Sequence, residues 1–164
     1  MSIKKILKYP NLNLQIKSKN ILFINNNIIQ IIKDLIDTMY YYNGIGISAP
    51  QINILKNIIV INVNEKYKQT LIIINPKIIY NKEKVVSSEG CLSFPGIFIN
   101  VKRKKNIKIQ FISIKNNNKI IKTNNLLSIC LQHEIDHLNG ITLYNKMSNF
   151  KKNVYFKKNA KWIK

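Results

Sequence analysis

Both histidines of the chain fall in one short segment, Gln132-His133-Glu134-Ile135-Asp136-His137-Leu138-Asn139-Gly140. The two are four residues apart, and a glutamate directly follows the first. On an α-helix, residues i and i+4 share a face, so both imidazoles can reach one metal ion while the Glu134 carboxylate stands beside the open coordination position. The H-E-x-x-H pattern therefore predicts a hydrolytic metal site on a helix. The alternative is that both histidines are hydrogen-bonded core residues.

The flanking residues predict where this helix begins and ends. Asn124 or Asn125 can cap its first turn, and Gly140 stands where many helices end in a left-handed residue. Apolar residues cover most of the surface between, namely Leu126, Leu127, Ile129, Cys130, Leu131 and Leu138. A helix that is apolar on most sides is expected to be largely buried.

A catalytic metal site needs a third protein ligand and one position left for water. The cysteines Cys91 and Cys130 are the candidates. Cys130 shares the helical face, but the metal would sit near the level of residue 135, roughly 7 Å further along the axis, which a cysteine sulfur cannot span. Cys91, from another part of the fold, is therefore the expected ligand, and Cys130 is expected to be a small core residue.

Three segments of the chain resemble the motifs of peptide deformylases. Residues 89–93 match the EGCLS motif, residues 132–140 match QHExDHLxG, and residues 44–51 match G-x-G-x-A-A-x-Q. They occur in the family's order, and the resemblance extends from Tyr9 to about Tyr144. The one departure inside the motifs is Ser48, which stands for the usual alanine and leaves the expected chemistry unchanged.

The resemblance implies a hydrolase that removes the N-formyl group from the N-terminal formylmethionine of new polypeptides and releases formate. Cys91, His133 and His137 would hold one divalent metal with water in the fourth position. Deformylases commonly use iron(II), and zinc, nickel or cobalt would accept the same ligands. Glu134 would take the proton of the water and pass it to the leaving amine.

The same resemblance implies the remaining parts of the site. The Gln51 amide and the backbone N–H of Leu92 would donate hydrogen bonds to the formyl oxygen. The methionine side chain would enter a pocket lined by Ile45, Leu126, Ile129 and Cys130. The peptide would lie as an added strand along the backbone of Gly44, Ile45 and Gly46, so that residues beyond methionine are read loosely. By residue type alone, the four pocket residues would be ordinary core.

Acidic residues are scarce, which makes their positions informative. Three of the seven, Glu89, Glu134 and Asp136, fall inside the motifs. We expect Glu89 or Asp136 to orient a ligand histidine, and one of them to pair with Arg103, the only arginine.

The formal net charge is +20, with 27 basic and 7 acidic residues. Such a charge ordinarily suggests a nucleic acid or an anionic surface as partner. However, 34 Ile, 26 Lys and 25 Asn fill 85 of 164 positions, whereas alanine occurs twice. These three residue types have AT-rich codons, so a base bias of the genome explains the charge without selection for binding. We therefore expect no specific nucleic-acid binding, although RNA would be attracted at low salt.

The remaining pattern predicts an α+β fold in a single domain over residues 1–164. Short, mostly antiparallel strands are expected to pack around the central metal-binding helix. Before it, we expect an irregular arm over residues 1–20 and an N-terminal helix over 27–43 that ends at Gly44. The expected strands are residues 57–63, 71–74, 77–80, 85–88 and 106–114, a hairpin partner at 119–123, and a further strand at 141–144. A short C-terminal helix is expected within residues 148–164.

No signal-peptide pattern or membrane-spanning apolar run is visible, and two cysteines do not make a disulfide framework, so we expect a cytoplasmic protein with no membrane partner. The basic tail, with Lys151, Lys152, Lys157, Lys158, Trp162 and Lys164, suggests contact with the ribosome. Two other interpretations remain. One is a general H-E-x-x-H metalloprotease, which Cys91 disfavours, and the other is a non-catalytic basic protein associated with RNA or the ribosome.

Overall fold

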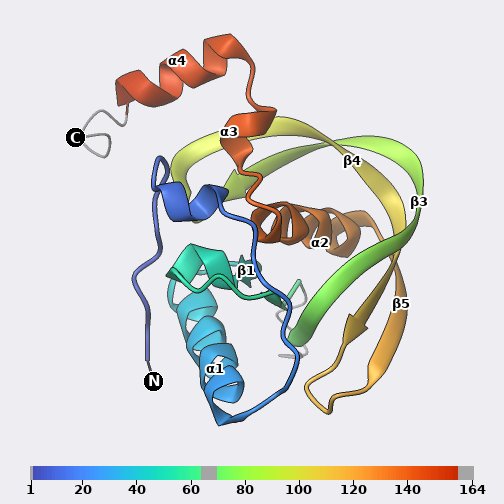
Figure 1. The fold of residues 1–164 in the computed structure, drawn as a ribbon. Coiled ribbons are helices and arrows are strands. Elements are labelled where there is room, and N and C mark those ends of the chain that lie inside the picture. Colours follow the sequence, from blue (N-terminus) through green and yellow to red (C-terminus); the bar gives the residue numbers. More distant parts are fainter. Residues whose placement is uncertain (1, 64–69, 159–164) are drawn as a thin grey trace.

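The computed structural model describes residues 2–63 and 70–158. Its helices are η1 (Leu12–Gln15), α1 (Asn26–Tyr41), η2 (Ala49–Ile52), α2 (Asn125–Leu138), α3 (Leu143–Lys146) and α4 (Asn149–Lys158). Its strands are β1 (Gly46–Ser48), β2 (Ile58–Ile61), β3 (Leu71–Cys91), β4 (Phe94–Ile112) and β5 (Asn118–Asn124). The strands form one antiparallel sheet in the order β1-β2-β3-β4-β5. The predicted α+β class with antiparallel strands is confirmed, and β3 and β4 curve around α2 (Figure 1).

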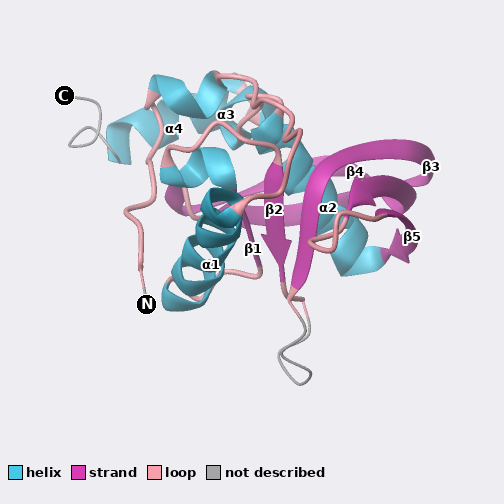
Figure 2. Cartoon of the chain, turned by 60° about the horizontal axis from the view of Figure 1, so that its bottom comes forward, coloured by secondary structure: helices cyan, strands magenta, loops and turns pink. Residues whose placement is uncertain are grey.

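Helix α1 forms where helical periodicity predicts it. The Asn25 side chain caps its first turn by accepting a hydrogen bond from the backbone N–H of Ile28 at 3.0 Å. Its apolar face packs beside β1 and β2 (Figure 2). The expected stop at Gly44 is wrong, because the helix ends at Tyr41 and Asn43 takes the left-handed conformation, with φ 52°. Asparagine tolerates this region better than most residues, which explains the shift.

Strands β3 and β4 form one long hairpin rather than the several short strands predicted. Asn75, with φ 50°, and Pro76, which lacks an N–H, mimic a strand boundary, but β3 continues through them with register shifts between residues 74 and 77 and between 78 and 80. Strand β4 begins at Phe94, although only residues 106–114 were predicted. The prediction of short strands is therefore wrong here. Asn75 and Pro76 are residue types common in turns, but they lie within one long, irregularly paired strand.

The C-terminal third mixes confirmed and wrong predictions. Strand β5 pairs with β4 as the predicted hairpin partner, and α2 begins at Asn125, after the N-cap Asn124. Gly140 has φ 72°, as expected after this helix. The expected strand at 141–144 is wrong, because Thr142 and Asn145 form a capping box that starts α3 instead. Helix α4 is the predicted C-terminal helix, while Trp162 and Lys164 lie outside the described residues.

Three apolar clusters fix the elements that carry the candidate site. One lies between α1 and β1–β2, the second between α2 and the inner face of β2–β4, and the third joins Tyr9, Phe94 and Tyr155. The second cluster holds α2 against the sheet, and the third holds the turn between β3 and β4. Among the described helices, none has both the length and the apolar character to cross a membrane.

Candidate active site

Helix α2 brings His133, Glu134 and His137 together as the spacing predicted. The two imidazoles are one helical turn apart, with ring centroids 5.0 Å from each other. His133 is 9% exposed, Glu134 3% and His137 1%. The three side chains therefore form a desolvated cluster, in which every charge interacts more strongly than in water.

Cys91 reaches the same cluster from the end of β3. The turn to β4 begins directly after it, and its sulfur accepts a hydrogen bond from the backbone N–H of Ser93 at 3.4 Å. The Cys91 sulfur lies 3.2 Å from Nε2 of His137. Ligand atoms of Cys91, His133 and His137 all lie within 4.8 Å of one another. The predicted ligand residues thus converge, whereas Cys130 stands outside the cluster and is buried in the core, as expected.

The donor set fits a divalent transition metal. Burial opposes ionisation of the Cys91 thiol, but the neighbouring imidazoles outweigh this effect and hold its pKa well below the usual range. A thiolate and two imidazoles are ligands that zinc and iron(II) accept. Nδ1 of His133 lies 2.9 Å from Oε2 of Glu89, which leaves its Nε2 as the ligand atom. Nδ1 of His137 is buried and has no hydrogen-bond partner among the described residues.

Glu134 is a buried carboxylate beside this cluster. Burial raises its pKa, and the negative charge of Cys91 acts in the same direction, while the two imidazoles lower it. Its Oε2 has no hydrogen-bond partner within the described part of the chain. A Cβ added at Gly46 would lie 2.9 Å from Oε1 of Glu134 and 2.7 Å from the sulfur of Cys130. Glycine in β1 therefore lets the strand approach α2 closely enough to cover this carboxylate.

Gln51 faces the cluster from η2 with a defined amide orientation. Its Oε1 accepts hydrogen bonds from the backbone N–H of Ser48 at 2.9 Å and from the Ser48 hydroxyl at 3.1 Å. Nε2 therefore points to the other side, where it lies 3.7 Å from the Cys91 sulfur and 3.3 Å from Oγ of Ser93. The nearby Ser48 hydroxyl also lowers the pKa of the Glu134 carboxyl, against the larger effect of burial. The serine that departs from the family motif thus lies between two predicted catalytic residues.

Glu89, Arg103 and Asp136 form a network behind the histidines. Arg103 donates to both oxygens of Glu89, from Nε at 2.7 Å and from Nη2 at 2.9 Å, and its Nη1 lies 2.5 Å from Oδ2 of Asp136. Burial alone would raise the pKa of Glu89, but hydrogen bonds from Arg103 and His133 lower it to about 2. Glu89 contacts a histidine, whereas Asp136 pairs with Arg103 and Lys146. Glu89 and Asp136 therefore both pair with Arg103, whereas only one of them was expected to do so.

A cavity of about 610 Å³ opens in front of the cluster. It is lined by every residue predicted to contact substrate, namely Gly44, Ile45, Gly46, Leu126, Ile129 and Cys130, and by Gln51, Leu92 and Glu134. Ile45 and Leu126 are 42% and 50% exposed, so these apolar side chains face an open surface and not the core.

Sequence reasoning missed other residues of this cavity. Lys8 reaches it from the N-terminal arm, where its ammonium donates to the carbonyl oxygen of Leu92 and lies 5.9 Å from the Tyr42 ring centroid. Phe98, 69% exposed, lines it from β4. No local pattern marks these residues, because only the arm packing and the hairpin bring them to the site.

The chain is similar to known proteins along nearly its whole length. The family model described as "Polypeptide deformylase" matches residues 3–153. A peptide deformylase of Baumannia cicadellinicola is 43% identical over 164 residues, covering 100% of this chain and 98% of the relative. One from Buchnera aphidicola subsp. Cinara cedri is 48% identical over 141 residues, covering 85% and 95%.

Solved structures agree with these relatives. The crystal structure of peptide deformylase from Ehrlichia chaffeensis in complex with actinonin has a TM-score of 0.93 and 36% identity, with 98% of each chain covered. A structure from Legionella pneumophila has a TM-score of 0.94 and 32% identity, covering 98% of this chain and 95% of that one.

Proposed function

This chain belongs to the polypeptide deformylase family, and we propose that the cavity in front of Cys91 is where it removes the N-formyl group from newly made polypeptides. The reaction is metal-dependent hydrolysis: a water oxygen bonds to the formyl carbon, the C–N bond breaks, and formate and a free amine leave. The observation that carries the site assignment is the convergence of one thiolate and two imidazoles, within 4.8 Å, beside a buried carboxylate.

Cys91, His133 and His137 would hold the metal, and α2 would be the metal-binding helix around which β3 and β4 curve. When bound, a divalent metal lowers the pKa of a coordinated water and polarises the formyl oxygen. Glu89 fixes the ring of His133 through Nδ1, and Arg103 holds Glu89 in place through two hydrogen bonds.

Glu134 would serve as general base and then general acid. Its carboxylate accepts the proton of the attacking water and later delivers it to the departing amine nitrogen. Burial, which raises its pKa, brings the carboxylate closer to the value at which both transfers proceed near neutral pH. The covering strand β1 limits access of bulk water to it.

Gln51 and Leu92 would stabilise the negative charge that develops on the formyl oxygen. Ser48 holds Oε1 of Gln51, so that Nε2 remains available as a donor. The backbone N–H of Leu92 would be the second donor. Removing one such donor typically slows an enzyme by about 10²–10³-fold, which is the effect expected for Gln51→Leu.

The substrate would lie as an added strand along Gly44, Ile45 and Gly46, with its methionine side chain between Leu126, Ile129 and Cys130. Peptides with different residues after methionine should therefore be accepted, since backbone contacts do not distinguish side chains. The likeness to a deformylase solved with actinonin supports a ligand in the matching cavity. We propose that residues 1–164 act as one such domain.

We propose iron(II) as the metal in the cell, with zinc, nickel or cobalt accepted by the same ligands. Protein purified without oxygen should carry about one iron per chain by elemental analysis, and its activity should decay in air but not under argon. Zinc in the anaerobic preparation and activity that is stable in air would overturn the choice of iron.

The expected location is the cytoplasm, where a thiolate ligand stays reduced. We also propose that the basic tail, from residue 148 onward, contacts the ribosome, because the tail is positively charged. Of this segment, Lys151 donates to the carbonyl of Phe98 and Lys152 lies over the Tyr144 ring, so only part of its charge faces outward. A tailless variant that pellets with ribosomes as well as the full chain would remove the basis for this contact.

Formate release from a formyl-Met-Ala peptide, with and without a chelator, tests the proposed function. The expected result is rapid release that the chelator abolishes and that added metal restores. Cleavage at internal peptide bonds instead would indicate a general metalloprotease. Absence of any hydrolysis from metal-loaded, folded protein would indicate a non-catalytic protein.

A further inference from the structure

The outer face of the β3–β4–β5 ladder carries a continuous set of lysines. Along β4, Val101, Arg103, Ile107 and Ile109 are buried, so the alternate residues face away from the core. Cross-strand partners share a face, which places six lysines together on the outer side. This lysine ladder consists of Lys82, Lys84, Lys102, Lys104, Lys108 and Lys122.

The register sets like charges directly opposite each other. Lys84 pairs with Lys104, and Lys108 pairs with Lys122. Like charges directly opposite in an antiparallel pair destabilise the sheet. None of the six forms an ion pair with a residue in the described part of the chain. The face thus carries an excess of unpaired positive charge in the isolated protein, and a bound polyanion would reduce the repulsion between its lysines.

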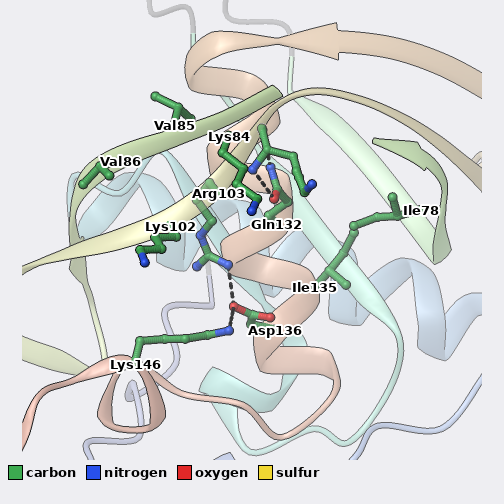
Figure 3. Close-up of a pocket in the computed structure, with 11 residues that line it drawn as sticks. Ile78, Lys84, Val85, Val86, Lys102, Arg103, Gln132, Ile135, Asp136 and Lys146 are labelled. Atoms are coloured by element: carbon green, nitrogen blue, oxygen red, sulfur yellow. Dashed lines mark hydrogen bonds and ion pairs between the residues drawn. The ribbon is translucent and has the colours of Figure 1, made fainter. Parts of the chain in front are cut away.

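A pocket of about 500 Å³ lies at one end of the ladder, between the hairpin and α2. Figure 3 shows Lys84, Lys102 and Lys146 around it, with Arg103 inside. Its one acidic residue, Asp136, is already paired with Arg103 and Lys146. The remaining lysines of the rim, Lys84, Lys102 and Lys104, therefore leave an excess of positive charge in a concave site.

We propose that the lysine ladder binds the phosphate backbone of single-stranded RNA, with one phosphate seated in this pocket. An exposed aromatic ring lies within the ladder: Tyr80 is 47% exposed, pairs with Lys108, and has its ring 5.5 Å from the Lys108 ammonium. A basic track with an aromatic ring for base stacking is the usual surface for single strands. None of the six lysines lines the catalytic cavity, so bound RNA leaves that cavity open.

Base bias in the genome gives the competing explanation of these lysines, and a matched pair of variants separates the two. The ladder variant replaces Lys84, Lys102, Lys104 and Lys122 with Gln. The control variant replaces four exposed lysines of the N-terminal region, Lys5, Lys17, Lys19 and Lys33, with Gln. Both lose four charges, so net charge alone predicts equal effects. Circular dichroism and melting temperature check that both are folded.

Binding to a fluorescent oligouridylate is measured by anisotropy across a salt titration. Each lost phosphate contact flattens the slope of log K against log salt by about 0.7 for a single strand, so the ladder variant should lose about 3 of slope and at least about tenfold in affinity at low salt. The control should stay within about twofold of the unmodified chain. Replacement of the same ladder residues by Arg should keep the binding.

Two outcomes overturn the proposal. Equal weakening in the ladder and control variants would show that net charge alone attracts RNA. Full binding by the folded ladder variant would show that the ladder is not the contact surface. Vesicles rich in anionic phospholipid serve as the second probe, and ladder-dependent binding to vesicles without binding to RNA would replace RNA by a membrane surface.

Discussion

The catalytic cavity and the lysine ladder are built on the same two strands, but they organise charge in opposite ways. Behind the cavity, Arg103 is buried against Glu89 and Asp136, and Glu89 also contacts His133. On the ladder, Lys84 faces Lys104 and Lys108 faces Lys122, while the nearby Glu83 pairs with Lys105, which is outside the ladder. Where chemistry demands an acid or an arginine, the chain has one despite its bias. Where a phosphate backbone is the proposed partner, lysine supplies the charge.

Replacing Glu134 with Gln tests the cavity side most strongly. Loss of a general acid–base group should lower kcat by about 10²–10⁴-fold, since the shape of the side chain is kept and only proton transfer is lost. Metal content, measured by elemental analysis, should not change. A variant with activity within threefold of the unmodified enzyme would remove Glu134 from the mechanism.

Arg103 and Lys105 are neighbouring cations of β4 that differ in burial, so removing each should change stability by a different amount. Arg103→Met leaves Glu89 and Asp136 without their buried partner, and should lower the free energy of unfolding by about 3–5 kcal/mol, measured by urea denaturation. The matched change, Lys105→Met, removes an exposed pair with Glu83 at 3.8 Å and should alter stability by less than about 1 kcal/mol. Similar losses in the two variants would contradict the contrast between buried and exposed charge.

The pH dependence of stability should report the same network. The pKa of Glu89 falls to about 2 in the folded chain, below its ordinary value of 4.5, so the folded state binds fewer protons than the unfolded state in this range. Its contribution to stability is complete above about pH 4.5 and is lost as the pH falls toward 2. In the Glu89→Gln variant, measured with a chelator present, the free energy of unfolding should fall less between pH 4.5 and 2 than in the unmodified chain. Urea denaturation at several pH values measures this, and an equal fall in both proteins would contradict the role given to Glu89.

The smallest effect is expected on the ladder. Lys84→Gln removes repulsion with Lys104, so stability should rise by about 0.2–1 kcal/mol at low salt, and the gain should shrink in high salt. Urea denaturation at two ionic strengths measures this. A loss of stability that is independent of salt would mean that Lys84 contributes packing rather than unpaired charge.

The same contrast explains what the sequence could predict. Cys91, His133 and His137 converge as expected, because i, i+4 spacing and ligand chemistry leave few arrangements. The length of β3 was not predictable, since Asn75 and Pro76 resemble a boundary but are absorbed in an irregular ladder. Lys8 and Phe98 reach the cavity through tertiary packing, which leaves no periodic signal.

The shift of the helix end and the wrong strand at 141–144 have local causes. Asn43 replaces the expected Gly44 as the left-handed residue, and a capping box between Thr142 and Asn145 outweighs the apolar run there. In both cases asparagine, abundant in this chain, performs a role usually given to another residue. A biased composition thus weakens sequence prediction at element ends more than at the site.

X-ray absorption at the metal edge of anaerobically purified protein is the most direct test of the site. After loading with zinc, the protein should show one sulfur at about 2.3 Å and two imidazole nitrogens at about 2.0–2.1 Å, with the sulfur lost in Cys91→Ser. A shell of nitrogen and oxygen alone in the unmodified, active enzyme would contradict this ligand set.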